Sequence, residues 1–280
     1  MKNLDANNLD SPTVAGFGEA WTRFDQSALP EVERPRICDD YPSVFPWELV
    51  DPDFSGAELR CGTGRSAVLA APRVGVLHCV DPRSAIEIAR LNCRPPDNVR
   101  SHRASVDALP FEDGSLDFAY SLGVLHHVPD TVAAIRSVAR KLRIGAPIQL
   151  YLDYAFDNRR FWFRSLWRAC DMVRQFVARM PFGLRFITSR VLAAVIYLPL
   201  ARTALLLDRV RAMPASFPLA FYRDKSFYAM HAEALDQCGT WLEKRFTKKQ
   251  IEAILRSAGM GSVRFSDRMP YSCVSSVREH

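Results

Sequence analysis

The chain has 280 residues, of which 48% are hydrophobic and 24% are charged, an ordinary globular composition that excludes disorder along the whole length. Its formal charge of +6 predicts a basic face, which suits anionic ligands, a membrane surface and nucleic acid alike. The sign of the charge does not choose among these partners.

Seven dispersed cysteines without a C-x-x-C pair predict buried free thiols in a reducing compartment, so neither a disulfide nor a metal site is expected. The first residues lack the basic-then-apolar layout of a signal peptide, and a cytoplasmic location is therefore predicted. The longest apolar run, residues 191–201, contains Pro199 and ends at Arg202. A spanning helix needs about 20 apolar residues, so no transmembrane segment is predicted.

Residues 1–50 form an N-terminal arm with four aromatic side chains, Trp21, Phe24, Phe45 and Trp47, too many for a disordered tail. We expect the arm to pack on the body of the protein, either as plain core or as a roof over a cofactor cleft.

From residue 56 onward, strands and helices alternate at short intervals. Predicted strands begin at residue 56 and cover 75–81, 98–104, 116–123 and 146–153; predicted helices cover 66–71, 84–92, 130–145 and 247–259; a hairpin follows at 262–267 and 271–277. Such alternation predicts an α/β fold with a parallel, doubly wound sheet and a ligand at the carboxyl ends of its strands.

The rhythm breaks in residues 156–212, which contain eleven arginines, no lysine and three aspartates. Two long helices separated at residues 181–183 are predicted, the first with an apolar stripe that includes Phe163 and Trp167 and a basic ridge of Arg160, Arg164 and Arg168. The segment is either a cap that recognises the acceptor or a solvated basic face. The predicted organisation is an arm (1–50), a core (51–155 and 245–280) and an inserted helical region (156–244).

Chemistry-bearing residues follow the predicted strands. Gly62, Gly64 and Ala67 fit the pattern G-x-G-x-x-A, which by itself does not separate a nicotinamide enzyme from an adenosyl-cofactor enzyme. Acids lie before the turn and after the next two strands, and two histidines follow the fourth strand. They are Glu58, Asp81, Asp107, His126 and His127.

This series resembles the class I S-adenosylmethionine-dependent methyltransferases, in particular the small-molecule enzymes of the methyltransferase type 11 kind, over about residues 54–155 and again at 247–277. The resemblance implies a Rossmann-like, seven-stranded, mainly parallel sheet with an antiparallel last strand. It also implies a cofactor site in which Glu58 supports the methionine amino group, Gly62 and Gly64 admit the cofactor, and Asp81 accepts the ribose hydroxyls. Asp107 would take the adenine amino group, beside Ala108, and Ser121 completes the predicted set.

One residue departs from the family's acid-x-Gly-x-Gly-x-Gly turn, because Arg60 replaces the first glycine. A large side chain at that position either obstructs the pocket or pairs with the cofactor's carboxylate.

The resemblance implies methyl transfer from S-adenosylmethionine to a small molecule, leaving S-adenosylhomocysteine, with oxygen, nitrogen and carbon acceptors all open. His126 and His127 are candidate bases, or they cap their loop. Two alternatives remain: an inactive homologue that binds cofactor or a partner, and a peripheral membrane methyltransferase with an anionic or lipid-linked acceptor. No nucleic-acid partner is predicted, and the oligomeric state is left open.

Overall fold

The computed structural model describes residues 8–25, 28, 30, 33, 45–94, 97–156, 161–214, 217–267 and 272–280. The chain divides into two compact units. The sheet unit comprises Met1–Trp21, Pro35–Arg159 and Leu242–His280. The helical unit comprises Thr22–Arg34 and Arg160–Trp241.

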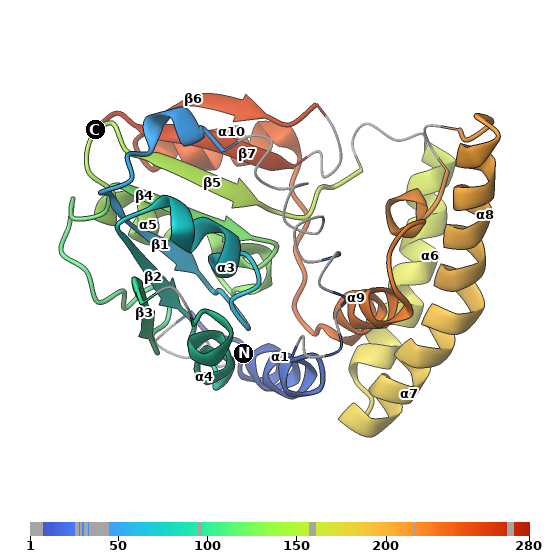
Figure 1. Ribbon diagram of the computed structural model, residues 1–280. Helices are drawn as coiled ribbons and strands as arrows, with labels where there is room; N and C mark the ends of the chain where they lie inside the picture. Colours follow the sequence, from blue (N-terminus) through green and yellow to red (C-terminus); the bar gives the residue numbers. More distant parts are fainter. Residues whose placement is uncertain are drawn as a thin grey trace, which may run out of the picture. The chain divides into compact units, whose positions relative to one another are not determined.

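The sheet unit is built on one seven-stranded sheet with the order β3-β2-β1-β4-β5-β7-β6 (Figure 1). Its strands are β1 (Ser55–Leu59), β2 (Val76–Val80), β3 (Val99–His102), β4 (Phe118–Leu122), β5 (Pro147–Tyr151), β6 (Met260–Phe265) and β7 (Cys273–Arg278). The first five strands pair in parallel, and β7 is antiparallel to both β5 and β6. The predicted Rossmann-like fold class is therefore confirmed.

The helices of the sheet unit are α1 (Ser11–Arg23), α3 (Ala67–Ala70), α4 (Ala85–Asn92), α5 (Thr131–Lys141) and α10 (Lys248–Ser257). Side chains cap α1, α5 and α10, whereas α3 and α4 begin without a side-chain cap hydrogen bond. The Asp130 carboxylate accepts the Ala133 N–H at 2.9 Å at the start of α5. Thr247 and Gln250 form a reciprocal capping box at the start of α10. Each cap satisfies backbone donors that the first helical turn leaves unpaired.

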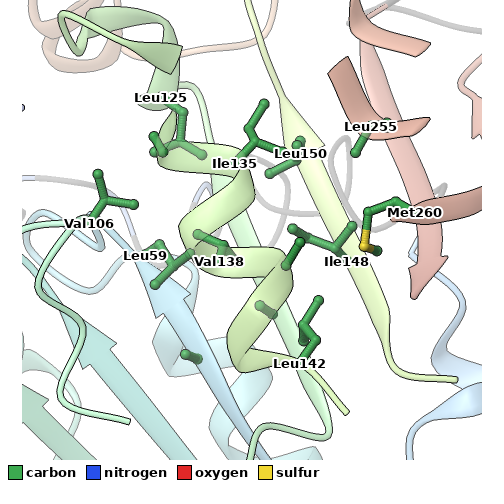
Figure 2. Close-up of a cluster of buried hydrophobic side chains, with 14 of the residues drawn as sticks. Leu59, Val106, Leu125, Ile135, Val138, Leu142, Ile148, Leu150, Leu255 and Met260 are labelled. Atoms are coloured by element: carbon green, nitrogen blue, oxygen red, sulfur yellow. The ribbon is translucent and has the colours of Figure 1, made fainter. Parts of the chain in front are cut away.

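One core lies between the sheet and helices α5 and α10 (Figure 2). Ile135, Val138 and Leu142 recur at helical spacing on α5 and are fully buried against β1 and β5, where Leu59 and Ile148 are buried too. Burying each such side chain stabilises the fold by about 1.5–3 kcal/mol. A second buried cluster, which includes Leu77, Ile86 and Phe118, completes the packing of the sheet. These two cores fix the strand ends from which the candidate site is built.

The helical unit contains α6 (Phe161–Ala178), a long helix and α9 (Phe227–Gly239). The long helix runs from Phe182 to Arg209 through α7 (Phe182–Leu192), the π-helical turn η5 (Ala193–Tyr197) and α8 (Leu198–Arg209). The break predicted at residues 181–183 overlaps the start of this helix at Phe182, whereas α6 ends at Ala178. The sequence did not predict α9, which Ser226 caps by accepting the Ala229 N–H at 3.2 Å.

The expectation that the apolar run at residues 191–201 is interrupted at Pro199 is wrong, because the long helix continues through it. Pro199 does not end it, because a π turn precedes the proline and accommodates its missing N–H. Its 28 residues contain an 18-residue window of mean hydropathy 1.7, long and apolar enough to cross a membrane by length and composition alone. Only 17% of that window is buried, so it is not an ordinary core helix.

Other expectations for the helical region have mixed outcomes. Cys170 is exposed and Cys238 is partly exposed, so not every cysteine is buried as predicted. The apolar stripe predicted on the first helix also includes Val173 and Val177, of which Val177 is buried but Val173 is 61% exposed. The side chains of Phe163, Arg160 and Arg164 lie outside the described residues. The acceptor-recognising cap stays a prediction.

Candidate functional site

In the turn between β1 and α3, every second residue has a backbone conformation in the left-handed region. Arg60, Gly62 and Gly64 have φ of 56°, 57° and 78°. A side chain at Gly64 would place its Cβ 2.7 Å from the Cys93 sulfur of the α4 end, so this position requires glycine. Arg60 therefore keeps a backbone conformation that favours glycine while carrying a large side chain.

Asp81, at the end of β2, is fully buried and joins this turn. Its Oδ2 accepts the Gly62 N–H at 3.0 Å. Arg83 donates its backbone N–H and Nε to Oδ1, at 2.9 and 2.6 Å, and Nη2 to Oδ2 at 2.5 Å. Burial alone would raise the pKa of Asp81, but the Arg83 charge and hydrogen bonds leave it below its usual value. Four donors fill the acceptor positions of this carboxylate.

Glu58 lies in β1, 3% exposed, before the glycine turn. It accepts hydrogen bonds from the Ser66 hydroxyl and, at 3.1 Å, from the Tyr120 hydroxyl. Burial raises the pKa of Glu58 to about 7, against the two hydrogen bonds, which lower it. An added cation would favour the ionised form of this carboxyl.

Arg60 is 5% exposed, and its buried Nε and Nη2 have no hydrogen-bond partner among the described residues. Burial, together with the neighbouring Arg83 charge, lowers the pKa of Arg60 to about 10, so it stays a cation at neutral pH. A buried cation with two unpaired donors is suited to an anionic group of a ligand.

Asp107 and Ala108 follow β3 in an exposed loop. The Asn8 amide donates to Asp107 Oδ1 at 3.3 Å and to the Asp130 carbonyl at 2.7 Å. Asn8 thus ties this loop to the start of α5, a link that the sequence did not predict. Partial burial of its carboxyl group raises the pKa of Asp107, although the Asn8 hydrogen bond opposes the shift.

Helix α1 brings Trp21, which was expected to pack on the body or to roof a cofactor cleft, together with Thr13 and Phe17, which sequence reasoning missed. Thr13, Phe17 and Trp21 recur every fourth residue and so share one helix face. The Phe17 ring centroid lies 5.2 Å from the His127 ring centroid and 5.2 Å from the Arg83 guanidinium carbon. Trp21 lies beside Gly62, and its buried Nε1 has no partner among the described residues. The i, i+4 spacing was the available signal for this face.

His126 and His127 lie in the 3₁₀ turn η4 (Leu125–His127) after β4 and are 2% and 5% exposed. His126 Nδ1 accepts the Asp153 N–H at 3.3 Å, which places its proton on Nε2, 3.7 Å from Asp153 Oδ1. His127 Nδ1 donates to the Leu242 carbonyl at 2.7 Å, which leaves Nε2 able to accept a proton. Burial lowers the pKa of His126 to about 3 and that of His127 well below its usual value.

Polar residues at the end of β5 extend the site beside His126. The Tyr151 hydroxyl donates to Asp153 Oδ1 at 3.2 Å, and Arg245 lies 3.3 Å from Asp153 Oδ2. Ser121 is buried in β4, where its hydroxyl donates to the Leu59 carbonyl at 3.0 Å, a contact that ties β4 to β1. The structure therefore brings Glu58, Arg60, Gly62, Asp81 and the two histidines to the carboxyl ends of the strands.

Residues 57–148 match the methyltransferase domain family. That segment runs from Ala57 in β1 to Ile148 in β5, and the seven-stranded sheet around it has the order described above. The fold and the match together identify a class I S-adenosylmethionine-dependent methyltransferase domain.

Several proteins are similar to parts of the chain. The 27-O-demethylrifamycin SV methyltransferase of Amycolatopsis mediterranei is 30% identical over 131 residues, 45% of this chain and 47% of that protein. The O-methyltransferase resE of Aspergillus sclerotiorum is 34% identical over 98 residues, 33% of this chain and 37% of that protein. The chain thus spans half or less of the length of these curated relatives.

A solved complex between the Trm112 methyltransferase activator of Haloferax volcanii and a protein described as a methyltransferase contains a similar chain. The identity is 12%, the TM-score is 0.51, and the match covers 94% of this chain and 97% of that chain. At this identity the likeness concerns the fold alone.

The donors and acceptors at the glycine turn fit S-adenosylmethionine in most respects. Glu58 can accept from its ammonium group, and the unpaired donors of Arg60 and Trp21 suit its carboxylate. Asp81 is the exception, because Arg83 already fills acceptor positions that the ribose hydroxyls would need. Ribose binding at Asp81 would require the Arg83 guanidinium to move aside.

Proposed function

We propose that the chain transfers the methyl group of S-adenosylmethionine to an oxygen atom of a small molecule. The supporting observation is the contact between Gly62 and Asp81 at 3.0 Å across two strand ends, inside the segment that matches the methyltransferase domain. The O-methyltransferase names of the relatives favour oxygen as the acceptor atom. The cytoplasmic location predicted from the sequence stays a prediction.

The chain's own residues would bind and orient the reactants. S-adenosylmethionine, when bound, supplies a methyl group already activated by its sulfonium charge, so positioning is the main task of the protein. Arg60 would hold the cofactor's carboxylate, Glu58 its ammonium, and Asp81 its ribose. Phe17 and Trp21 of α1 would exclude water from the glycine turn.

The acceptor hydroxyl has to lose its proton as the new carbon–oxygen bond forms. We assign this proton to His127 Nε2, because Nδ1 of His127 is committed to the Leu242 carbonyl and Nδ1 of His126 already accepts from the backbone. The Leu242 carbonyl would then orient the ring, in the way that a fixed acceptor orients a general base.

A second candidate is a methyltransferase-fold protein that binds cofactor without turnover, favoured by the low pKa values that burial gives both candidate bases, His126 and His127. Calorimetric titration with S-adenosylhomocysteine, followed by transfer assays on hydroxylated aromatic acceptors, separates the two. We expect binding and transfer, with binding weakened at least about tenfold by Asp81→Asn and transfer lost in His127→Gln. Binding without transfer to any acceptor would favour the second candidate, and no binding would contradict both.

A further inference from the structure

In the long helix of the helical unit, the large apolar side chains are exposed and the small or polar ones are buried, the reverse of the usual pattern in a water-soluble protein. Its large apolar residues point outward: Leu184, Ile187, Val191, Val195 and Leu206 are each more than half exposed. We call these five residues the apolar stripe. The first four are spaced three or four residues apart, and Leu206 follows after about three further turns, so all five lie on one face of the helix.

The opposite face of the same helix is small and polar. The residues buried within the unit are Arg185, Ser189, Ala193, Ala201 and Ala204. In a helix that packs on a water-soluble core, the large apolar residues are inside and the small or polar ones face outward. Small residues at helix contacts with large apolar residues outside are instead the pattern of helices that face lipid.

Neighbouring α6 continues this pattern. Phe161, Met172, Val173 and Phe176 are all more than 60% exposed. Helices α6 and α7 are in contact, and Figure 1 shows α6 alongside the long helix. Exposed apolar area of this extent marks a binding surface rather than ordinary solvated surface.

The charge of the unit indicates what binds there. The segment Arg160–Trp241 contains eleven arginines and one lysine against five acids. Arg168, Arg190 and Arg209 are exposed and form no ion pair within the described residues. Apolar side chains among unpaired arginines match the acyl chains and phosphates of an anionic lipid surface.

We propose that the helical unit docks on an anionic membrane, with the apolar stripe in the interfacial layer and the long helix parallel to the surface. Charged residues argue against a spanning orientation. Between Arg190 and Arg202 there are eleven uncharged residues, about 17 Å of helix, whereas the hydrocarbon core is about 30 Å thick. A second copy of the chain is disfavoured as the occupant, because the same positively charged surface would face itself.

Vesicle sedimentation of the full chain tests this inference independently of cofactor binding. The chain should bind vesicles with about 30% phosphatidylglycerol more tightly than pure phosphatidylcholine, and less tightly as salt is raised. Changing Ile187, Val191 and Val195 together to glutamine should lower the partition coefficient at least about tenfold. The single change Val195→Gln should act in the same direction and guards against loss of folding in the triple variant.

A matched control uses Leu91→Gln with Ile144→Gln, residues that are 69% and 68% exposed on the sheet unit, and should leave partition unchanged. Arg168, Arg190 and Arg209 changed to glutamine should lower binding to anionic vesicles about fivefold per residue and leave binding to neutral vesicles unchanged. Arg94, Arg103 and Arg140 changed together provide the charge-matched control.

Two results would overturn the proposal. One is equal vesicle binding by the apolar-stripe variants and their controls. The other is a dimer in light scattering that Val195→Gln dissociates, with no vesicle binding by the parent, which would assign the stripe to a second copy. S-adenosylhomocysteine affinity should be the same in all folded variants. A failure of vesicle binding can therefore be told apart from a failure of the proposed methyl transfer.

Discussion

Arg60 concentrates two unfavourable features at the centre of the candidate site. A non-glycine residue in the left-handed region costs about 1–2 kcal/mol. Its buried Nε and Nη2 lack partners among the described residues, which adds about 1–3 kcal/mol. Such costs persist at positions where the residue serves a ligand, because a less demanding residue would otherwise suffice. We infer that Arg60 pairs with the cofactor's carboxylate rather than obstructing it.

Substitution of Arg60 should therefore separate stability from binding. Arg60→Gly should raise the free energy of unfolding by about 1 kcal/mol, because strain and an unpaired cation are removed while glycine adds some chain entropy. It should also weaken S-adenosylhomocysteine binding about tenfold or more, as expected for a lost charged hydrogen bond. Arg60→Met, which keeps the bulk and the strained backbone, should show the binding loss without the full gain in stability. Tighter binding by Arg60→Gly in calorimetry would show that the arginine obstructs the pocket.

The strands and most helices of the sheet unit could be predicted because each has a local signal. Apolar strands run into turn glycines, and Asp130 and Thr247 cap α5 and α10 in the structure as their sequences indicate. The arm that contains Trp21 was expected to pack on the body, but helix α1 and Phe17 were not predicted, because their role depends on contacts with residues far along the chain. The second long helix was predicted, but its 18-residue apolar window was not, because Pro199 normally ends a helix and no local rule predicts the π turn before it.

In the candidate site, too, features with a local sequence signal were predictable and features that depend on tertiary contacts were not. Glycines and acids at strand ends were predictable from order and spacing along the chain. The pairing of Asp81 with Arg83 was not, since a sequence does not show which of several nearby donors a buried carboxylate selects. The burial of His126 and His127, which depresses their pKa values, likewise depends on tertiary packing.

The glycine turn and α4 form one packed junction that can be tested with two glycines. Gly64 and Gly145 have similar φ, 78° and 82°, but only at Gly64 would a Cβ meet neighbours, the Cys93 sulfur at 2.7 Å and the Ala89 Cβ at 3.2 Å. Gly145→Ala should lower the free energy of unfolding by about 1 kcal/mol, from backbone strain alone. Gly64→Ala should lower it by a further 1–3 kcal/mol or so, because α4 must shift. Equal losses in urea unfolding would contradict the close approach of α4.

At the scale of the whole sheet unit, buried titratable groups make stability depend on pH. Burial lowers the pKa of His78 to about 4, that of His126 to about 3 and that of His127 well below its usual value. His78 also shares a hydrogen bond with His102, Nδ1 to Nε2 at 2.8 Å, on the outer strands of the sheet. Glu58 acts in the opposite direction, because burial raises its pKa to about 7.

These shifts set the direction of acid unfolding. Each histidine has a folded pKa below its unfolded value of about 6.5, so the unfolded chain takes up protons first and stability falls as the pH falls below about 6.5. Glu58 takes up its proton in the folded state between about pH 7 and 4.5, which offsets one histidine over that window. Burial also lowers the pKa of His102, so near pH 5.5 the histidines take up more protons on unfolding than Glu58 releases, and each net proton is worth about 1.4 kcal/mol per pH unit.

The free energy of unfolding, measured by urea titration at intervals between pH 7 and 4.5, should therefore fall steadily with decreasing pH. His78→Gln should make the dependence shallower by up to about one proton, because one of the depressed groups is gone. Glu58→Gln should make it steeper by a similar amount, since the opposing group is removed. The variants are compared with the parent by the slope of the free energy of unfolding against pH. Their absolute stabilities are not compared, because both substitutions also change packing and hydrogen bonds at neutral pH. A parent profile that is flat or rises toward pH 4.5 would show that these histidines are not held neutral by burial.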